Sequence, residues 1–247
     1  LLPLVLSPLA GFGVGFLIMW LIYWIFARVM RSKVNRIFRK MQLVSAAFMA
    51  TSHGLNDAQK TMGIITLTLI AVGLQPSGSG PQLWVIAVCG LAIALGTYMG
   101  GWRVIRTLGK GLTEIATPQG FAAEASSATT ILVSSHLGFA LSTTQVCSGS
   151  IIGSGLGKKG GAIDWKVAAR MLVAWLVTFP AAGVIGAAAC AVAKINVWGT
   201  LAVAAIAVVA ALIIFRLSRR NPINAMNVNE GSEVKVNAKV ATAAAAA

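Results

Sequence analysis

The sequence predicts an all-α integral membrane protein, built as a bundle of transmembrane helices. The chain of 247 residues has a mean hydropathy of +0.82, and only 11% of its residues are charged, against about 25% in soluble proteins. Several apolar stretches approach the roughly 20 residues that a helix needs to cross a bilayer. Helices are favoured because they satisfy every backbone polar group internally.

The net charge of +14 does not indicate binding to nucleic acid. The basic residues cluster at the ends of apolar segments, as they do in the cytoplasmic loops of membrane proteins. Cys89, Cys147 and Cys190 stand far apart within apolar segments, which predicts neither a disulfide framework nor a zinc site. We therefore expect no resident metal and no cofactor.

The first span is predicted at residues 4–27. The segment after it holds six basic residues within thirteen positions, which predicts that it is cytoplasmic: Arg28, Arg31, Lys33, Arg36, Arg39 and Lys40. The second segment, residues 41–73, is too long for one plain transmembrane helix. Because it carries the polar sequence "TSHGLNDAQKTMG" (51–63) at its middle, we expect a broken helix, with two half-helices around the break.

A third span is expected at residues 83–101, between an uncharged external loop and the basic cytoplasmic segment "GWRVIRTLGKG". The stretch from Gly120 to Gly157 then begins after one cytoplasmic loop and ends at another, "KKGGAIDWK", which excludes an odd number of crossings. These 38 residues are too few for two full helical crossings and the turn between them. The sequence therefore predicts a re-entrant hairpin of two half-helices that enters and leaves on the cytoplasmic side.

A fourth span is expected at residues 167–193 and a fifth at 199–215. Residues 1–220 thus form a multi-pass transmembrane domain whose basic loops are cytoplasmic, and the polar, alanine-rich residues 221–247 form a flexible cytoplasmic tail. The sequence starts within an apolar run and has no initiator Met, so we expect it to be a piece of a longer chain.

Two groups of polar residues within the membrane could carry chemistry, and the first is Asn56 and Asp57 beside Gly54. A carboxylate at the bilayer centre costs at least about 2.5 to 3.5 kcal/mol on insertion scales, so it is by default a functional residue. At a helix break this carboxylate and freed carbonyl groups could hold a cation. The alternative is a structural network in which Asp57 pairs with Lys60 or His53.

The second group is Ser142, Thr143 and Thr144, which are good N-cap residues for the half-helix that follows. A helix N-terminus within the membrane offers free N–H groups and a positive dipole to an oxyanion. The alternative is that these hydroxyls only bond back to their own helix. Glu124, near the start of the hairpin, could point inwards to a cation site or could merely cap the hairpin at the interface.

Together these residues predict a symporter. An anion at the hairpin N-terminus would be repelled by Asp57 and Glu124, because two like charges about 4 Å apart cost on the order of 4 kcal/mol at an effective dielectric constant of 20. Binding of Na⁺ or H⁺ to the carboxylates removes this repulsion, so that cation and anion are carried together. An enzyme is not expected, because no nucleophile with its base and no metal triad is evident.

At these residues the sequence resembles the inorganic phosphate transporter (PiT) family. The motif "GLNDAQKTMG" is similar to the family's Gly-x-Asn-Asp signature, "GWRVIRTLGKGLTEIATPQGFAAEASSA" to the stretch that follows it, and "GFALSTTQVCSGSIIGSGLG" to its Ser-Thr-Thr hairpin. The three motifs stand in the right order, and the resemblance covers most of residues 1–218.

The resemblance implies two inverted repeats, each with one broken Asn-Asp helix and one hairpin, with phosphate and coupling cations between them. This chain holds one of each, so it would be the second repeat, without the N-terminal half. The resemblance implies cation coordination by Asn56, Asp57 and Glu124. It implies phosphate contact for Ser142, Thr143 and Thr144, and we include Asn56 beside them. Ala140 and Gln145 stand where the family often has Pro and His, and Gln145 cannot titrate.

The predicted function is therefore Na⁺- or H⁺-coupled symport of inorganic phosphate across the cell membrane. A sulfate permease of the same fold is one alternative, because a helix N-terminus binds either tetrahedral anion. A membrane scaffold subunit, in which polar residues only hold helices together, is another. The expected partners are membrane lipid, phosphate and the missing N-terminal repeat; a homodimer stays open, and nucleic acid is not a partner.

Overall fold

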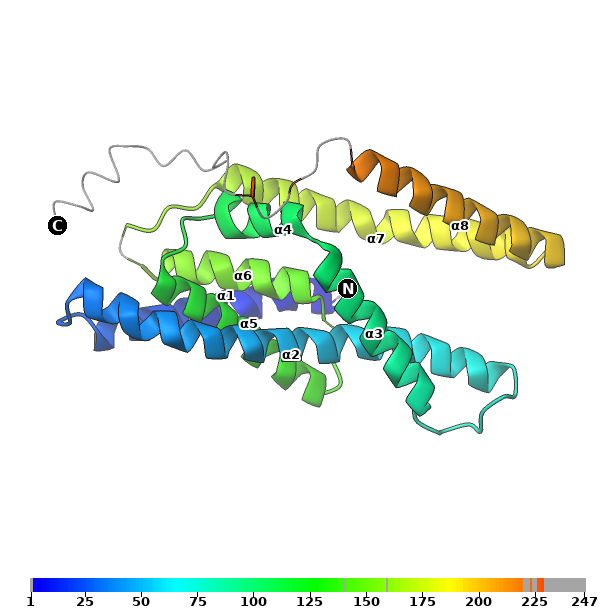
Figure 1. The fold of residues 1–247 in the computed structure, drawn as a ribbon, viewed down its shortest axis with the longest axis horizontal. Helices are drawn as coiled ribbons and strands as arrows, with labels where there is room; N and C mark the ends of the chain where they lie inside the picture. Colours follow the sequence, from blue (N-terminus) through cyan, green and yellow to red (C-terminus); the bar gives the residue numbers. More distant parts are fainter. Residues whose placement is uncertain (1, 140, 159, 220–222, 224–225, 229–247) are drawn as a thin grey trace. The chain divides into compact units, whose positions relative to one another are not determined.

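The computed structural model describes residues 2–139, 141–158, 160–219, 223 and 226–228 (Figure 1). All regular structure in these residues is helical, apart from an isolated β-bridge. The chain divides into two compact units, the first formed by residues 1–163 and the second by residues 164–230. The predicted tail, residues 221–247, lies outside the described residues except for 223 and 226–228.

The predicted spans agree with the observed helices to within a few residues. Among the described residues, three helices are long and apolar enough to cross a membrane: Val5–Ile25 within α1 (Leu2–Ile25), Trp165–Ala193 (α7) and Val197–Leu217 within α8 (Val197–Ser218). The bent pair of α3 (Leu83–Met99) with Trp102–Gly111 makes a fourth when it is counted as one span. The length and composition of these helices agree with the predicted multi-pass helical membrane protein.

The broken helix predicted within residues 41–73 is wrong, because α2 runs without interruption from Arg31 to Ala71. Gly54 lies inside α2 without a positive φ, and a helical Gly costs only about 1 kcal/mol relative to Ala. The polar side chains of α2 find partners to the side of the helix, so the backbone need not open. At 41 residues the helix is about 61 Å long, twice the hydrocarbon thickness of a bilayer.

The basic segment after α3 is helical rather than a loop. It forms the short helix α4 (Trp102–Arg106), which continues into the π-helical turn η1 (Thr107–Gly111). The chain turns by 61° between α3 and this segment. Gly101 makes the turn with φ of +97°, a left-handed conformation that favours glycine.

The predicted hairpin is present as two helices, α5 (Thr117–His136) and α6 (Thr143–Leu156), joined by residues 137–142. Its two ends are held together: Thr113 and Ile163 form the β-bridge, and Thr113 Oγ1 donates to the Ala162 carbonyl oxygen at 2.7 Å. The hairpin therefore starts and finishes at the same place. At 14 residues, α6 is about 21 Å long, which is too short to cross a bilayer.

The second arm of the hairpin packs against α1 through glycines on both helices. A Cβ atom at Gly11 of α1 would lie 2.4 Å from the carbonyl oxygen of Val146, and one at Gly153 of α6 would lie 2.1 Å from the carbonyl oxygen of Phe12. Gly15 of α1 and Gly149 of α6 make similar contacts, and small residues four positions apart let two backbones approach this closely within a membrane. The arm α6 is thus held against α1, while α5 packs against α1, α2 and α6 (Figure 1).

An aromatic cluster anchors the basic N-terminal part of α2. The ring of Phe38, which is 2% exposed, lies 5.3 Å from the ring centroids of both Phe26 and Phe121. Met19 and Ile22 of α1 complete this core. The start of α2 is therefore fixed against the end of α1 and the start of α5.

The second unit is a helical pair, α7 and α8, joined by residues 194–196. Both N-termini are capped by side chains: Asp164 accepts from the backbone N–H groups of Lys166 and Val167, and Asn196 accepts from that of Gly199. Most of the large apolar side chains on both helices are exposed, as expected of helices that face lipid or another apolar surface.

Candidate functional site

Asp57 of α2 is the centre of a polar cluster at the tip of the hairpin, which we call the tip cluster. Thr143 Oγ1, in the first turn of α6, donates to Asp57 Oδ2 at 3.2 Å. Lys60 Nζ donates to Asp57 Oδ1 at 3.0 Å and to the carbonyl oxygen of Leu141 at 2.8 Å. His53 Nδ1 lies 3.5 Å from Asp57 Oδ2. Asp57 therefore pairs with Lys60 and His53, and it also contacts the hairpin through Thr143.

Asn56 joins the tip cluster to the other arm of the hairpin. Its side chain is 6% exposed, its Nδ2 donates to Asp57 Oδ1 at 3.4 Å, and its Oδ1 accepts from Ser135 Oγ of α5 at 3.4 Å. Residues three or four positions apart share one face of a helix, which is why His53, Asn56 and Lys60 all reach the same side of α2. Three helices, α2, α5 and α6, therefore meet at Asp57.

The N-terminus of α6 lies directly beside this carboxylate. Ser142 is its N-cap residue and makes no side-chain capping bond. Thr143 is buried, Ser142 half-buried and Thr144 exposed. A helix start leaves its first N–H groups without partners inside the helix, and the dipole there favours an anion. The site therefore sets a carboxylate next to a helix terminus of the kind that favours an anion.

Glu124 lies elsewhere, in a second polar contact between α5 and α2. Its Oε2 accepts from Ser45 Oγ at 2.5 Å, and Gln42 also bonds the carboxylate. Ser45 and Asp57 are twelve residues apart on one continuous helix, a distance of about 18 Å along its axis. The structure therefore does not bring Glu124 together with Asp57, as a single shared cation site would require.

Comparison with known proteins decides the family, because residues 1–186 match the profile of the Phosphate transporter family. The chain belongs to this family. A probable low-affinity inorganic phosphate transporter of Mycobacterium leprae is 48% identical over 236 residues, covering 94% of this chain and 57% of that protein. One of Bacillus subtilis is 38% identical over 186 residues, covering 75% and 56%. A solved sodium-dependent phosphate transporter matches with a TM-score of 0.53 and 28% identity over 60% of this chain and 37% of that one.

Membership of the phosphate transporter family confirms the resemblance read from the Asn-Asp and Ser-Thr-Thr motifs, and it confirms that the chain is not an enzyme. The chain spans a little over half the length of these curated relatives.

Within this family member, three contacts were not foreseen from the sequence. They are the bond from Lys60 to a main-chain carbonyl, the bond from Ser45 to Glu124, and the one from Ser135 to Asn56. Gln145, which takes the place of a frequent family His, is 4% exposed, and in the described part of the chain its Oε1 has no hydrogen-bond partner.

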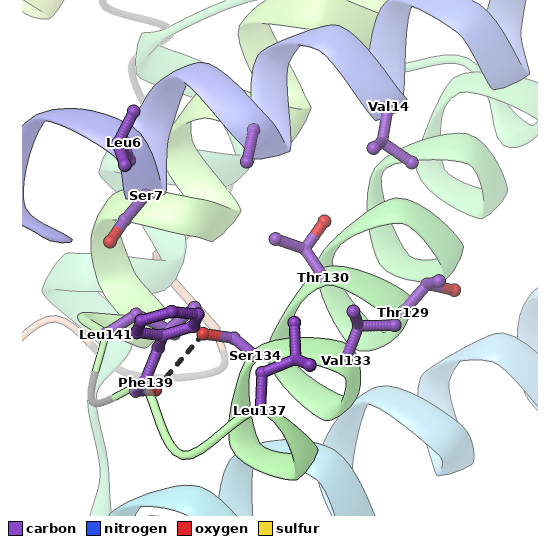
Figure 2. Close-up of a pocket in the computed structure, with 11 residues that line it drawn as sticks. Leu6, Ser7, Val14, Thr129, Thr130, Val133, Ser134, Leu137, Phe139 and Leu141 are labelled. Carbon is purple, nitrogen blue, oxygen red and sulfur yellow. Dashed lines mark hydrogen bonds between the residues drawn. The ribbon is translucent and has the colours of Figure 1, made fainter.

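A cavity of about 360 Å³ lies between α1, α5 and the hairpin tip (Figure 2). Its walls are mainly apolar, with Val14, Val133 and Leu137 among the lining residues. Ser134 Oγ, at its edge, is bonded to the Phe139 carbonyl oxygen at 3.1 Å. Such walls suit hydrocarbon rather than a hydrated anion, although the hydroxyl side chains of Ser7, Thr129 and Thr130 also line the cavity.

Proposed function

We propose that this chain is one half of a cation-coupled symporter of inorganic phosphate in the cell membrane. The observation that carries the proposal is the 3.2 Å bond between Thr143 and Asp57. It joins the start of an anion-binding helix to the carboxylate that would bind a cation. Membership of the phosphate transporter family supports phosphate as the anion, and the similarity to a solved sodium-dependent phosphate transporter supports Na⁺ ahead of H⁺ as the cation.

Coupling would follow from electrostatics at this contact. Phosphate is proposed to settle on the N-terminus of α6, with the side chains of Ser142, Thr143, Thr144 and Asn56 around it. Asp57 would repel such an anion whenever no positive group lies on it, because like charges about 4 Å apart cost on the order of 4 kcal/mol at an effective dielectric constant of 20. In the structure Lys60 holds that place, 3.0 Å from Asp57 Oδ1, and a cation on Asp57 and Asn56 would remove the cost once Lys60 has moved away, so that cation and phosphate bind together.

Glu124 is proposed to serve a cation site of its own. Ser45 and Gln42 hold its carboxylate against α2, and the length of helix between this contact and the tip cluster separates the two charges. A chain that neutralises two carboxylates at two places would carry more than one cation with each anion.

The other half of the transporter is proposed to be a second repeat of inverted topology, with the hairpin α5–α6 re-entering the membrane from the cytoplasmic side. Two observations support this arrangement. The chain matches only 57% of the length of its Mycobacterium leprae relative, and α1, α7 and α8 have exposed apolar faces. Membrane lipid is the expected surrounding, and a homodimer is a further arrangement to be tested.

The test is uptake of labelled phosphate by the full-length protein in liposomes, with Na⁺ and proton gradients imposed separately. Uptake driven by one gradient is expected, and Asp57→Asn should abolish it while leaving membrane insertion intact. Normal uptake by that variant would sink the assignment of Asp57. Unlabelled sulfate is expected to compete poorly; strong competition would favour a sulfate permease, and no uptake at all would favour a scaffold subunit.

A further inference from the structure

Lys60 makes a bridge between α2 and the hairpin tip that the proposed coupling scheme does not use. Its ammonium group contacts Asp57 Oδ1 at 3.0 Å and the Leu141 carbonyl oxygen at 2.8 Å. Leu141 precedes the N-cap residue of α6. One charged group thus holds together the cation-binding carboxylate and the segment that leads into the anion-binding helix.

The position of this ammonium group is chemically that of a bound monovalent cation. A carboxylate oxygen and a main-chain carbonyl oxygen are ligands that small hard cations take in proteins. An ammonium group has three donors and no acceptor, so it satisfies the same oxygens that a free cation would. Lys60 and a cation on Asp57 Oδ1 therefore compete for one place.

The ion pair is open enough to be exchanged. The side chain of Lys60 is 41% exposed and that of Asp57 is 30% exposed, and exposed ion pairs contribute little stability. The flexible stem of Lys60 allows its head to move into water while its Cα stays in the helix. The structure shows the ammonium group on Asp57, and this exposure allows a second state in which a cation takes its place.

We propose that Lys60 is a tethered counter-ion: it occupies the cation position on Asp57, ties the hairpin tip to α2, and must be displaced by the driving cation. This rests on the proposed function, because it assigns the competitor of a cation at the same site. It makes Lys60 a positioning residue that lowers the affinity for the cation. Lys60 also frees the Leu141 carbonyl oxygen only when the cation has bound, which loosens the hairpin tip but leaves the bond from Thr143 to Asp57 in place.

The other charged or titratable groups around Asp57 are few in the described residues. They are His53 from α2, 3.5 Å away, and the Cys147 thiol from α6, which lies within electrostatic reach. Lys60 therefore supplies the one permanent positive charge among these neighbours. Its removal should change the affinity for the cation before it changes any other property of the site.

The test compares Lys60→Gln with Lys60→Arg in the full-length transporter, in proteoliposomes. The half-saturating concentration of the cation that drives wild-type uptake, Na⁺ or H⁺, is expected to fall about fivefold in Lys60→Gln, on the scale of an exposed ion pair. The phosphate KM at saturating cation should stay the same, and Lys60→Arg should keep the wild-type cation dependence. Lys60→Met is the second neutral variant, in case Lys60→Gln does not insert.

A second readout follows the tether without transport. In a background without native cysteines, Phe139→Cys places a thiol in the exposed tip segment. Its labelling by a thiol reagent should be faster in the Lys60→Gln protein than in the Lys60→Arg protein, and faster with the driving cation than without it. This readout separates the tether from the proposed function, which fails if wild type takes up no phosphate.

Three results would overturn the inference. An unchanged cation dependence with a raised phosphate KM would show that Lys60 binds the anion itself. A lower maximal rate alone would assign it a structural role. Equal labelling of Phe139→Cys in the Gln and Arg proteins would show that no tether exists.

Discussion

Replacing Gly153 with Ala would force the hairpin away from α1. The new Cβ would lie 2.1 Å from the carbonyl oxygen of Phe12, whereas ordinary contact begins at 3.4 Å. Both partners are backbone in helices, which cannot rotate out of the way as a side chain can. The helices would have to separate by more than 1 Å at this point, and overpacking of this kind typically costs about 1 to 3 kcal/mol.

The assay is thermal unfolding of the full-length protein in detergent, paired with phosphate uptake. Gly153→Ala is expected to lower the apparent melting temperature by about 3 to 10 °C and to reduce uptake, because α6 carries the proposed phosphate site. Gly13→Ala is the matched control: it makes the same change on α1, where a Cβ would meet nothing within 4 Å. Equal melting temperatures for the two variants would refute the idea that glycine contacts fix α6 to α1.

Three further variants test other parts of the fold and site. Thr143→Val removes the hydroxyl that donates to Asp57 and should raise the phosphate KM about tenfold; an unchanged concentration dependence would remove the hairpin from the site. Ser45→Ala should lower the melting temperature by a few degrees, because a hydrogen bond to a charged group contributes about 1.5 to 3 kcal/mol, and Ser45→Thr should restore it. Gly101→Ala should lower the free energy of unfolding by about 1 to 2 kcal/mol, since φ is +97°. Gly96→Ala in α3, with open space around it, is the control and should not lower that free energy. Equal losses in the two variants would argue against backbone strain at Gly101.

The membrane spans could be predicted from the sequence because a bilayer sets a minimum length for an apolar helix. The helices α1, α7 and α8 follow from that rule alone, whereas α3 reaches the required length only together with Trp102–Gly111. The meeting of Asp57 with Thr143 agrees with the predicted symport site, in which a cation on Asp57 lies beside an anion at the start of the second hairpin helix. In both cases the signal lies in a run of residue types rather than in any single side chain.

The unbroken course of α2 and the contacts of Ser45 and Lys60 could not be predicted, because they depend on pairs of residues that are far apart in the sequence. Gly54 and the polar residues around it suggested a helix break, but α2 stays helical because its side chains bond to neighbouring helices. Ser45 and Glu124 are 79 positions apart, and Lys60 bonds a main-chain carbonyl oxygen, which every residue carries. The glycines four apart in α1 and α6 were a readable signal of close packing, although the partner of each helix was not.

The bridge between Thr113 and Ile163 gives the hairpin a fixed pivot. With both ends clamped at one place and α6 packed closely against α1, the two arms can move only together with α1, and any displacement grows with distance from the clamp. A tilt of about 10° at the base would move the far end of α5, about 30 Å away by helical rise, by about 5 Å. The tip cluster lies at that far end, so a small rotation at the base is mechanically amplified where Asp57 and Thr143 meet.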